Sequence, residues 1–171
     1  MKYQIPIGVS DFAEIRKNEY YYVDKTALIE ELLKTSAVKV TLITRPRRFG
    51  KTIGMSMLSS FFDIRKDSRE LFEGLNVAED TSLCQEWMNQ WPTIFLTFKK
   101  VDGLNFDSAY EMLASVMADL FNEHSYLLQD ERISAYDREM LESLSAVRED
   151  IATKQETLQN QQKALGDLQG R

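Results

Sequence analysis

Four cationic side chains lie close together in an otherwise acidic sequence: Arg45, Arg47, Arg48 and Lys51. The chain has 171 residues and a formal net charge of −6 at pH 7. A local group of cations on an acidic protein favours a site for one specific anion over a surface for a polyanion. Because a duplex-binding domain ordinarily carries a basic surface, we expect no direct nucleic-acid binding.

The sequence Gly50-Lys51-Thr52 closes this cationic stretch and has the residue types that hold the phosphates of a nucleotide. The lysine would reach the β- and γ-phosphates as a point charge, and the threonine hydroxyl would ligate Mg²⁺ on the nucleotide. Gly50 lets the backbone approach the ligand, and N–H groups at the start of the following helix point at the phosphates. The predicted nucleotide-binding residues are Arg45, Pro46, Arg47, Arg48, Phe49, Gly50, Lys51, Thr52 and Ile53, with Thr52 as the Mg²⁺ ligand of bound ATP.

The loop departs from the phosphate-binding pattern G-x-x-x-x-G-K-[ST] at its first position, where Arg45 stands. A non-glycine residue at positive φ is costly, and a residue before proline favours extended geometry, so we predict an extended turn set by Pro46. Pro46 has no N–H to offer, and bidentate contacts from Arg47 or Arg48 would compensate. Two alternatives remain: both guanidiniums pair with surface carboxylates, or the Gly-Lys-Thr triplet is a chance match at a helix start.

The elements that must position this loop are a strand before it and a helix after it. Residues 38–44, VKVTLIT, are β-branched and mostly apolar, which predicts a buried strand. A second strand is predicted at residues 93–98, TIFLTF. We predict helices at residues 27–34, 51–64 and 106–121, with a short segment at 71–75. The predicted fold class is α/β, a partial P-loop NTPase layer with a short parallel sheet and flanking helices, plus a helical C-terminal extension.

The character of the chain changes after Asp130, where it becomes rich in Glu, Gln and Lys. We therefore divide it into a P-loop region, residues 1–125, and a polar helical extension, residues 126–171. Lys154 and Gln161 interrupt a heptad frame in this extension. The apolar positions of the frame are Leu144, Val147, Ile151, Leu158, Leu165 and Leu168. This helix is a candidate surface for self-association or for a protein partner.

The loop RPRRFGKT resembles the degenerate Walker A motif of the bacterial and archaeal AAA-ATPase-like proteins. These are P-loop NTPases that usually carry a C-terminal PD-(D/E)xK nuclease-like domain. In that family arginine at the position of the first glycine is normal. Further segments resemble the N-terminal region of the family in the same order: PIGVSDFAEI at 6–15, YYYVDKTALI at 20–29, FF at 61–62, LFEGL at 71–75 and WPTIFLTFK at 91–99.

The resemblance implies an ATP-binding protein that uses Mg²⁺, but two parts of the family pattern are missing. No apolar strand ends in the Asp-Glu pair of a Walker B motif, which would supply the second Mg²⁺ anchor and the water-activating carboxylate. No Glu-x-Lys triplet occurs, so we expect no metal-dependent nuclease site. We therefore expect a shortened member that binds ATP without a complete hydrolysis site.

Other residues carry weaker signals. Asp24 and Lys25, in YVDKT, match a family motif and would line the nucleotide site, or else Asp24 caps a helix and Lys25 is exposed. The tyrosines at 20–22 would stack on a base, or else they alternate between core and surface. Cys84 and His124 have no partners at metal-ligand spacing.

Composition places the protein in the cytoplasm by expectation. No apolar run approaches the roughly 20 residues that span a bilayer, no signal peptide is visible, and the single cysteine excludes an internal disulfide. Two functions stay open: a nucleotide-binding module of an ATPase-like protein, or a protein-interaction module with a vestigial P-loop that works through its C-terminal helix.

Overall fold

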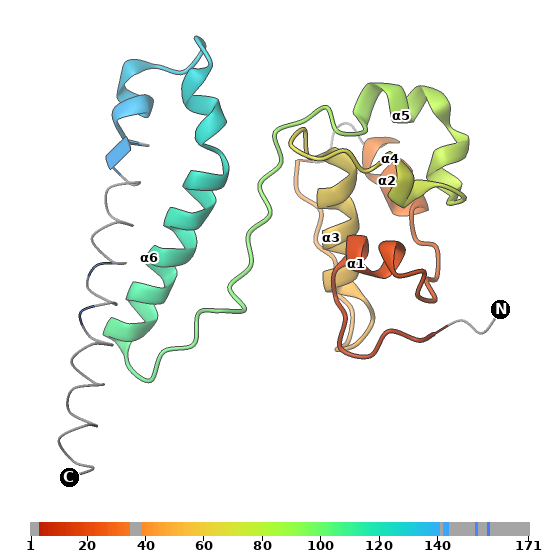
Figure 1. Cartoon of the computed structure of the whole chain (residues 1–171), viewed down its shortest axis with the longest axis horizontal. Helices are drawn as coiled ribbons and strands as arrows, with labels where there is room; N and C mark the ends of the chain where they lie inside the picture. The colour runs from red at the N-terminus through yellow and green to blue at the C-terminus, as the bar shows by residue number, and fades with distance from the viewer. Residues whose placement is uncertain (1–3, 35–38, 141, 144–152, 154–156, 158–171) are drawn as a thin grey trace. The chain divides into compact units, whose positions relative to one another are not determined.

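The computed structural model describes residues 4–34, 39–140, 142–143, 153 and 157. The chain divides into two compact units, Met1–Phe95 and Leu96–Arg171 (Figure 1). The predicted division at residue 125 follows a change in composition, whereas these two units are defined by contacts within the fold. The predicted division stays a prediction.

The first unit is built from short helices, coloured from red through yellow to green in Figure 1. The predicted helix at 27–34 is confirmed with its bounds. The predicted helix at 51–64 is confirmed but ends two residues earlier, because Asp63 is already extended (φ −65°, ψ 115°). The elements are α1 Phe12–Lys17, α2 Ala27–Lys34, α3 Lys51–Phe62, α4 Arg69–Phe72, the 3-10 helix η1 Asn76–Glu79 and α5 Thr81–Trp87.

An aromatic and aliphatic core holds these helices together. The ring of Phe72 lies 5.0 Å from that of Phe12 and 5.3 Å from that of Phe61, measured between centroids, so α1, α3 and α4 meet at one point. Edge contacts and tilted pairs of this kind are favourable beyond the area that they bury. The buried core consists of Phe12, Ile29, Met57, Phe61, Phe72, Leu75, Val77 and Met88.

Two side chains fix α1 against the rest of the core. The hydroxyl of Ser56, on α3, accepts from the backbone N–H of Phe12 (3.0 Å) and donates to the carboxylate of Asp11 (2.9 Å). On the other side of α1, the guanidinium of Arg16 donates to the carbonyls of Leu71 and Glu73, both at 2.7 Å. The middle of α3 and the C-terminal end of α4 are thereby held through α1.

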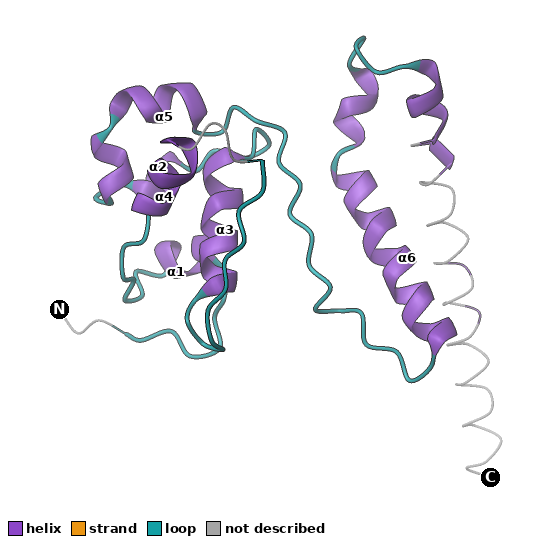
Figure 2. Cartoon of the chain, turned by 180° about the vertical axis from the view of Figure 1, so that it is seen from behind, coloured by secondary structure: helices purple, strands orange, loops and turns teal. Residues whose placement is uncertain are grey.

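The predicted α/β fold is wrong for the described residues, which contain helices and loops but no strand (Figure 2). Residues 39–44 and 93–98 are neither helical nor paired in a ladder, and the only bridge in the described part of the chain is an isolated parallel one between Asp63 and Trp91. Val40 and Leu42 are 82% and 83% exposed. β-Propensity measures how well a side chain packs on a half-buried, pleated sheet surface. An apolar, β-branched segment therefore does not become a strand when no neighbouring strand pairs with it.

The second unit contains α6 Phe106–Glu123 and the 3-10 helix η2 Ser125–Gln129. The helix predicted at 106–121 is confirmed and is two residues longer. A capping box between Asn105 and Ser108 starts it, because each residue's side chain accepts from the other's backbone N–H. Residues 135–140 are also helical. The predicted heptad positions, from Leu144 to Leu168, lie outside the described residues.

None of the helices that the structure describes is both long and apolar enough to cross a membrane.

Candidate nucleotide-binding site

The first turn of α3 has no side-chain cap, and among the described α-helices it shares this with the four-residue α4. Its N-cap is Gly50, in the left-handed conformation (φ 75°, ψ 20°), and no acidic residue occupies the first turn. By contrast, the side chains of Asp11, Asp80 and Asn105 cap α1, α5 and α6. The N–H groups that begin a helix have no intrahelical acceptor, and with the helix dipole they attract anions. At α3 no side chain at the N-cap competes for them.

The ammonium of Lys51 lies against the loop that precedes it. Its Nζ donates to the carbonyl oxygens of Arg45 (2.5 Å) and Pro46 (2.8 Å). These bonds hold the loop closed over the start of α3, where Lys51 and Thr52 are both exposed. The phosphate role predicted for Lys51 and the Mg²⁺ role predicted for Thr52 stay predictions.

The loop itself has its strained residue at Arg48. Arg47 and Arg48 form a turn, and Arg48 has a φ of 68°, whereas Arg45 is not among the described residues with positive φ. A non-glycine residue in this region costs roughly 1–2 kcal/mol. Within the described part of the chain, neither Arg47 nor Arg48 has a carboxylate partner. The guanidiniums are therefore available to an anion.

Lys25 reaches the same place from outside the loop. Its Nζ lies 3.4 Å from the carbonyl oxygen of Phe49 and 3.4 Å from the point where a Cβ on Gly50 would stand. A cavity of about 520 Å³ opens here, and Lys25 and Lys51 both line it. Residues 41–45 form one side of this cavity. The carboxylate of Glu31 also lines the cavity, beside the three cations Lys25, Arg45 and Lys51.

Asp24, the other residue of the predicted pair, does not line this cavity. Its carboxylate accepts from the N–H and hydroxyl of Thr26 (2.8 and 2.7 Å) and from the N–H of Asn76 (2.8 Å). Burial raises the pKa of Asp24, but these hydrogen bonds outweigh it and leave the pKa below its usual value. The buried Thr26 hydroxyl in turn accepts from the N–H of Val77 (3.2 Å). Asp24 thus joins the entry to α2 to η1 and fixes Lys25 beside it.

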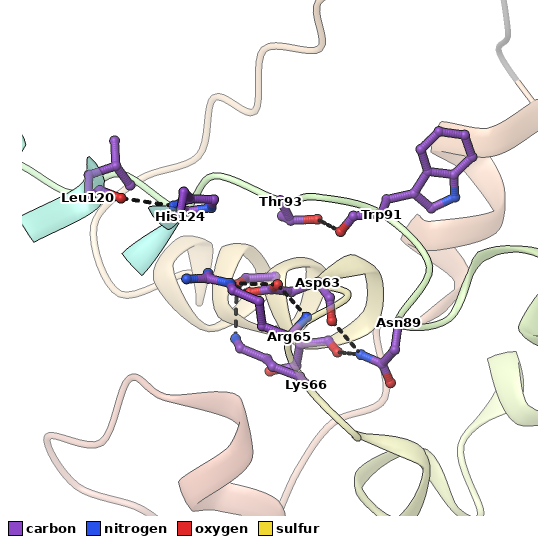
Figure 3. A network of polar contacts seen from close by, with 10 residues as sticks. Asp63, Arg65, Lys66, Asn89, Trp91, Thr93, Leu120 and His124 are labelled. Atoms are coloured by element: carbon purple, nitrogen blue, oxygen red, sulfur yellow. Dashed lines mark hydrogen bonds and ion pairs between the residues drawn. The ribbon is translucent and has the colours of Figure 1, made fainter. Parts of the chain in front are cut away.

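The opposite end of α3 carries a polar network with a different character (Figure 3). Asp63 is fully buried, and its carboxylate accepts from the backbone N–H and the guanidinium of Arg65, at 2.7 to 3.0 Å. Burial raises the pKa of Asp63, but the contacts with Arg65 and Lys66 outweigh it and lower the pKa below its usual value. The ammonium of Lys66 donates to the hydroxyl of Ser59 (3.0 Å).

Asn89 completes this network from a distant part of the sequence. Its side-chain amide donates to the carbonyls of Ser60 (3.1 Å) and Asp63 (3.0 Å), and its side-chain oxygen accepts from the N–H of Ser68 (3.0 Å). Asn89 has a φ of 56°, which asparagine tolerates better than most residues. Asn89 is not among the residues that the sequence motifs single out, because its partners lie more than 20 residues away in the sequence.

The remaining candidates have structural surroundings. The thiol of Cys84 donates to the carbonyl of Val77 (3.2 Å), and burial, with the charge of Asp80, raises its pKa. A ring nitrogen of His124 lies 2.9 Å from the carbonyl oxygen of Leu120. No group of three or more His, Cys, Asp or Glu residues that could hold a metal ion occurs among the residues described.

Comparisons with known proteins bear on the identity of this loop. The model of the AAA-ATPase-like family, described as predicted AAA-ATPase, matches residues 6–160. An uncharacterized protein in the vnfD 5′ region of Azotobacter chroococcum mcd 1 is 33% identical over 96 residues, which cover 56% of this chain and 17% of that protein. The chain thus spans less than a fifth of the length of this relative. No solved structure matches the chain.

Proposed function

The chain belongs to the AAA-ATPase-like family of predicted AAA-ATPases, and from that premise we propose that it binds ATP through the loop Arg45–Ile53 and the start of α3. Lys51 and Lys25 neutralise the phosphates, and the backbone N–H groups at the start of α3 donate to them. Arg47 or Arg48 adds a third cation from the turn. The Thr52 hydroxyl ligates the Mg²⁺ that accompanies the nucleotide.

The observation that carries this proposal is the uncapped start of α3 beside two ammonium groups that bond to loop carbonyls and have no ion-pair partner given among the described residues. Gly50 provides no side chain to accept from the first turn, and Lys25 and Lys51 line the hollow in front of it. The phosphates of a nucleotide would satisfy the backbone N–H groups and the ammonium groups together. A structural helix start needs no such collection of cations, because an acidic or amide cap satisfies it, as Asp11 does for α1.

Binding of a phosphate by Lys51 requires its ammonium to give up the hydrogen bonds to the Arg45 and Pro46 carbonyls. Those oxygens are neutral acceptors, and a phosphate oxygen is a charged one that forms a stronger bond with an ammonium. We expect Lys51 to leave the two carbonyls when nucleotide binds. The loop then loses the two hydrogen bonds from Lys51, and contacts with the bound phosphates replace them.

A thermal-unfolding experiment with Mg·ATP tests the proposal. A ligand at about 100 times its dissociation constant adds about 2.7 kcal/mol to the free energy of unfolding, which is several degrees of melting temperature for a chain of this size. We expect such a shift for the parent protein and none for Lys51→Ala. The melting temperature without ligand should change by less, because Lys51 is exposed.

Lys100→Ala is the matched control, because Lys100 is exposed and lines neither the loop nor its cavity. This variant should keep the full ATP shift. The proposal is wrong if millimolar Mg·ATP leaves the parent unchanged, or if Lys51→Ala shifts as far as the parent does. Either result would favour a vestigial loop in an interaction module.

A further inference from the structure

A second cavity, of about 500 Å³, adjoins the loop on the side of the N-terminal segment. Its walls are mainly apolar and aromatic, with Pro6, Tyr21, Tyr22, Phe49 and Ile53 among them. Among the described residues no carboxylate lines it, and the two charged residues that do are the cations Lys25 and Arg48. Its surface therefore suits a flat, largely apolar group that is attached to an anion.

The two cavities meet at the start of α3. Lys25, Phe49, Gly50 and Gly54 line both of them. A single ligand can therefore extend from the hollow in front of α3 into the apolar cavity, with its negative end at the cations and its apolar end among the tyrosines. Each cavity has a volume in the range of about 300–1,000 Å³ that is typical of small-molecule sites.

The aromatic wall is held in place before any ligand arrives. The hydroxyl of Tyr22 donates to the sulfur of Met57 (3.3 Å), and its ring meets that of Phe12 edge-on, with centroids 5.3 Å apart. The backbone N–H of Tyr21 donates to the carbonyl of Gln4 (3.0 Å). Tyr22 is thus part of the core, while Tyr21 stands at the rim, 51% exposed. A fixed aromatic surface loses little entropy when a ligand stacks on it.

We propose that this second cavity binds the base of the nucleotide whose phosphates lie in front of α3. Every nucleobase has a π-face that stacks on aromatic rings, and a guanidinium such as that of Arg48 adds to the attraction. Tyr21 is the stacking residue at the rim, and Tyr22 and Ile53 form the floor. This inference rests on the proposed ATP binding, because it assigns the other end of the same ligand.

The test compares ATP with inorganic tripolyphosphate, which has the phosphates and no base. Isothermal titration should show that the parent binds ATP more tightly than tripolyphosphate. Loss of one stacked aromatic ring costs about 1 kcal/mol or more, so Tyr21→Ala should weaken ATP binding about fivefold or more. Its affinity for tripolyphosphate should stay unchanged. Tyr21→Phe keeps the ring and should bind ATP like the parent.

Tyr136→Ala is the matched control, because Tyr136 is an exposed tyrosine that does not line either cavity. It should leave both affinities as in the parent. The inference is overturned if Tyr21→Ala leaves ATP binding unchanged, or weakens ATP and tripolyphosphate equally. In both cases the proposed phosphate site stands. If the parent binds neither ligand, the proposed function fails, and the base site fails with it.

A covalent label locates the base without relying on affinity. The adenine analogue 8-azido-ATP, photolysed on the parent protein, should attach within residues 20–23 or at Phe49, as mapped by mass spectrometry of the peptides. Competition by ATP should remove the label, and tripolyphosphate should remove it at higher concentration. An ATP-competed label on α5 or elsewhere away from this cavity would contradict the assignment.

Discussion

The two ends of α3 are made from one helix but have opposite polar chemistry. At the C-terminal end, Asp63 is buried and its carboxylate is fully engaged by Arg65. At the N-terminal end, Gly50 supplies no cap and Lys51 is exposed, and among the described residues its ammonium bonds to neutral loop carbonyls. Twelve residues at about 1.5 Å each place the ends roughly 18 Å apart.

This difference separates a structural polar cluster from one that can bind a ligand. A buried carboxylate with a guanidinium partner has little left to offer a ligand, and removing one partner leaves the other without compensation. Exposed cations beside unsatisfied helix N–H groups contribute little to the fold, yet they become valuable when an anion arrives. We therefore expect mutations at the C-terminal end to change stability, and mutations at the N-terminal end to change binding.

The largest expected effect on stability is that of Asp63→Ala. It removes the acceptor of three hydrogen bonds from Arg65, two of them from the guanidinium. We expect a loss of about 3 kcal/mol in the free energy of unfolding, because hydrogen bonds to charged groups and pairs at buried sites are costly to break from one side. Urea unfolding at pH 7 measures it, and ATP titration of the folded variant should give the parent affinity.

Asp67→Ala is the control for this variant. Asp67 is an exposed carboxylate near the same end of α3, so its removal should change stability by less than about 0.5 kcal/mol. A folded Asp63→Ala protein that no longer binds ATP would remove the distinction between the two ends. So would an unchanged stability for that variant.

The next effect concerns the start of the helix. Gly50→Ala places a side chain at φ 75°, which costs about 1–2 kcal/mol, and its Cβ would lie 3.4 Å from the Lys25 ammonium. Gly54→Ala, one turn later, meets no atom within 4 Å and should instead stabilise the helix by up to about 1 kcal/mol. Thermal unfolding of the two variants should give shifts of opposite sign. Equal shifts would show that the left-handed geometry at Gly50 is not needed.

The smallest expected effects are those of the loop arginines. Arg47→Ala and Arg48→Ala should each weaken ATP binding by a few-fold at low salt, and the difference should shrink as salt rises, because it arises from exposed charges. For Arg47→Ala the loss should be greater for ATP than for AMP. Arg48→Gly relieves the positive φ and should gain up to about 1 kcal/mol in stability while losing affinity. If both alanine variants bind ATP like the parent, Lys51 and the helix backbone suffice.

Local sequence determined the helices and the loop chemistry of this protein. The periodic segments at 27–34 and 51–62 are helical as predicted. Each has an apolar stripe that packs on the core, and this does not depend on the conformation of the loops between the helices. The family also follows from motifs that lie along the chain. The sequence predicts extended geometry at Arg45, and Arg45 is not among the described residues with positive φ; the loop has its positive φ at Arg48 instead. Local steric rules indicate that a turn is strained but not which residue takes the strain.

Tertiary structure decided what each polar residue does and whether the apolar segments pair. Residues 39–44 and 93–98 have strand composition, yet a strand needs neighbours, and none is provided among the described residues. Asp24 and Lys25 are adjacent in sequence, but Asp24 bonds to Asn76 while Lys25 reaches Phe49. Asn89 joins Ser60 to Ser68 over more than 20 residues. These hydrogen-bond partners depend on which distant segments the fold brings together. The order of residue types along the sequence does not specify those contacts.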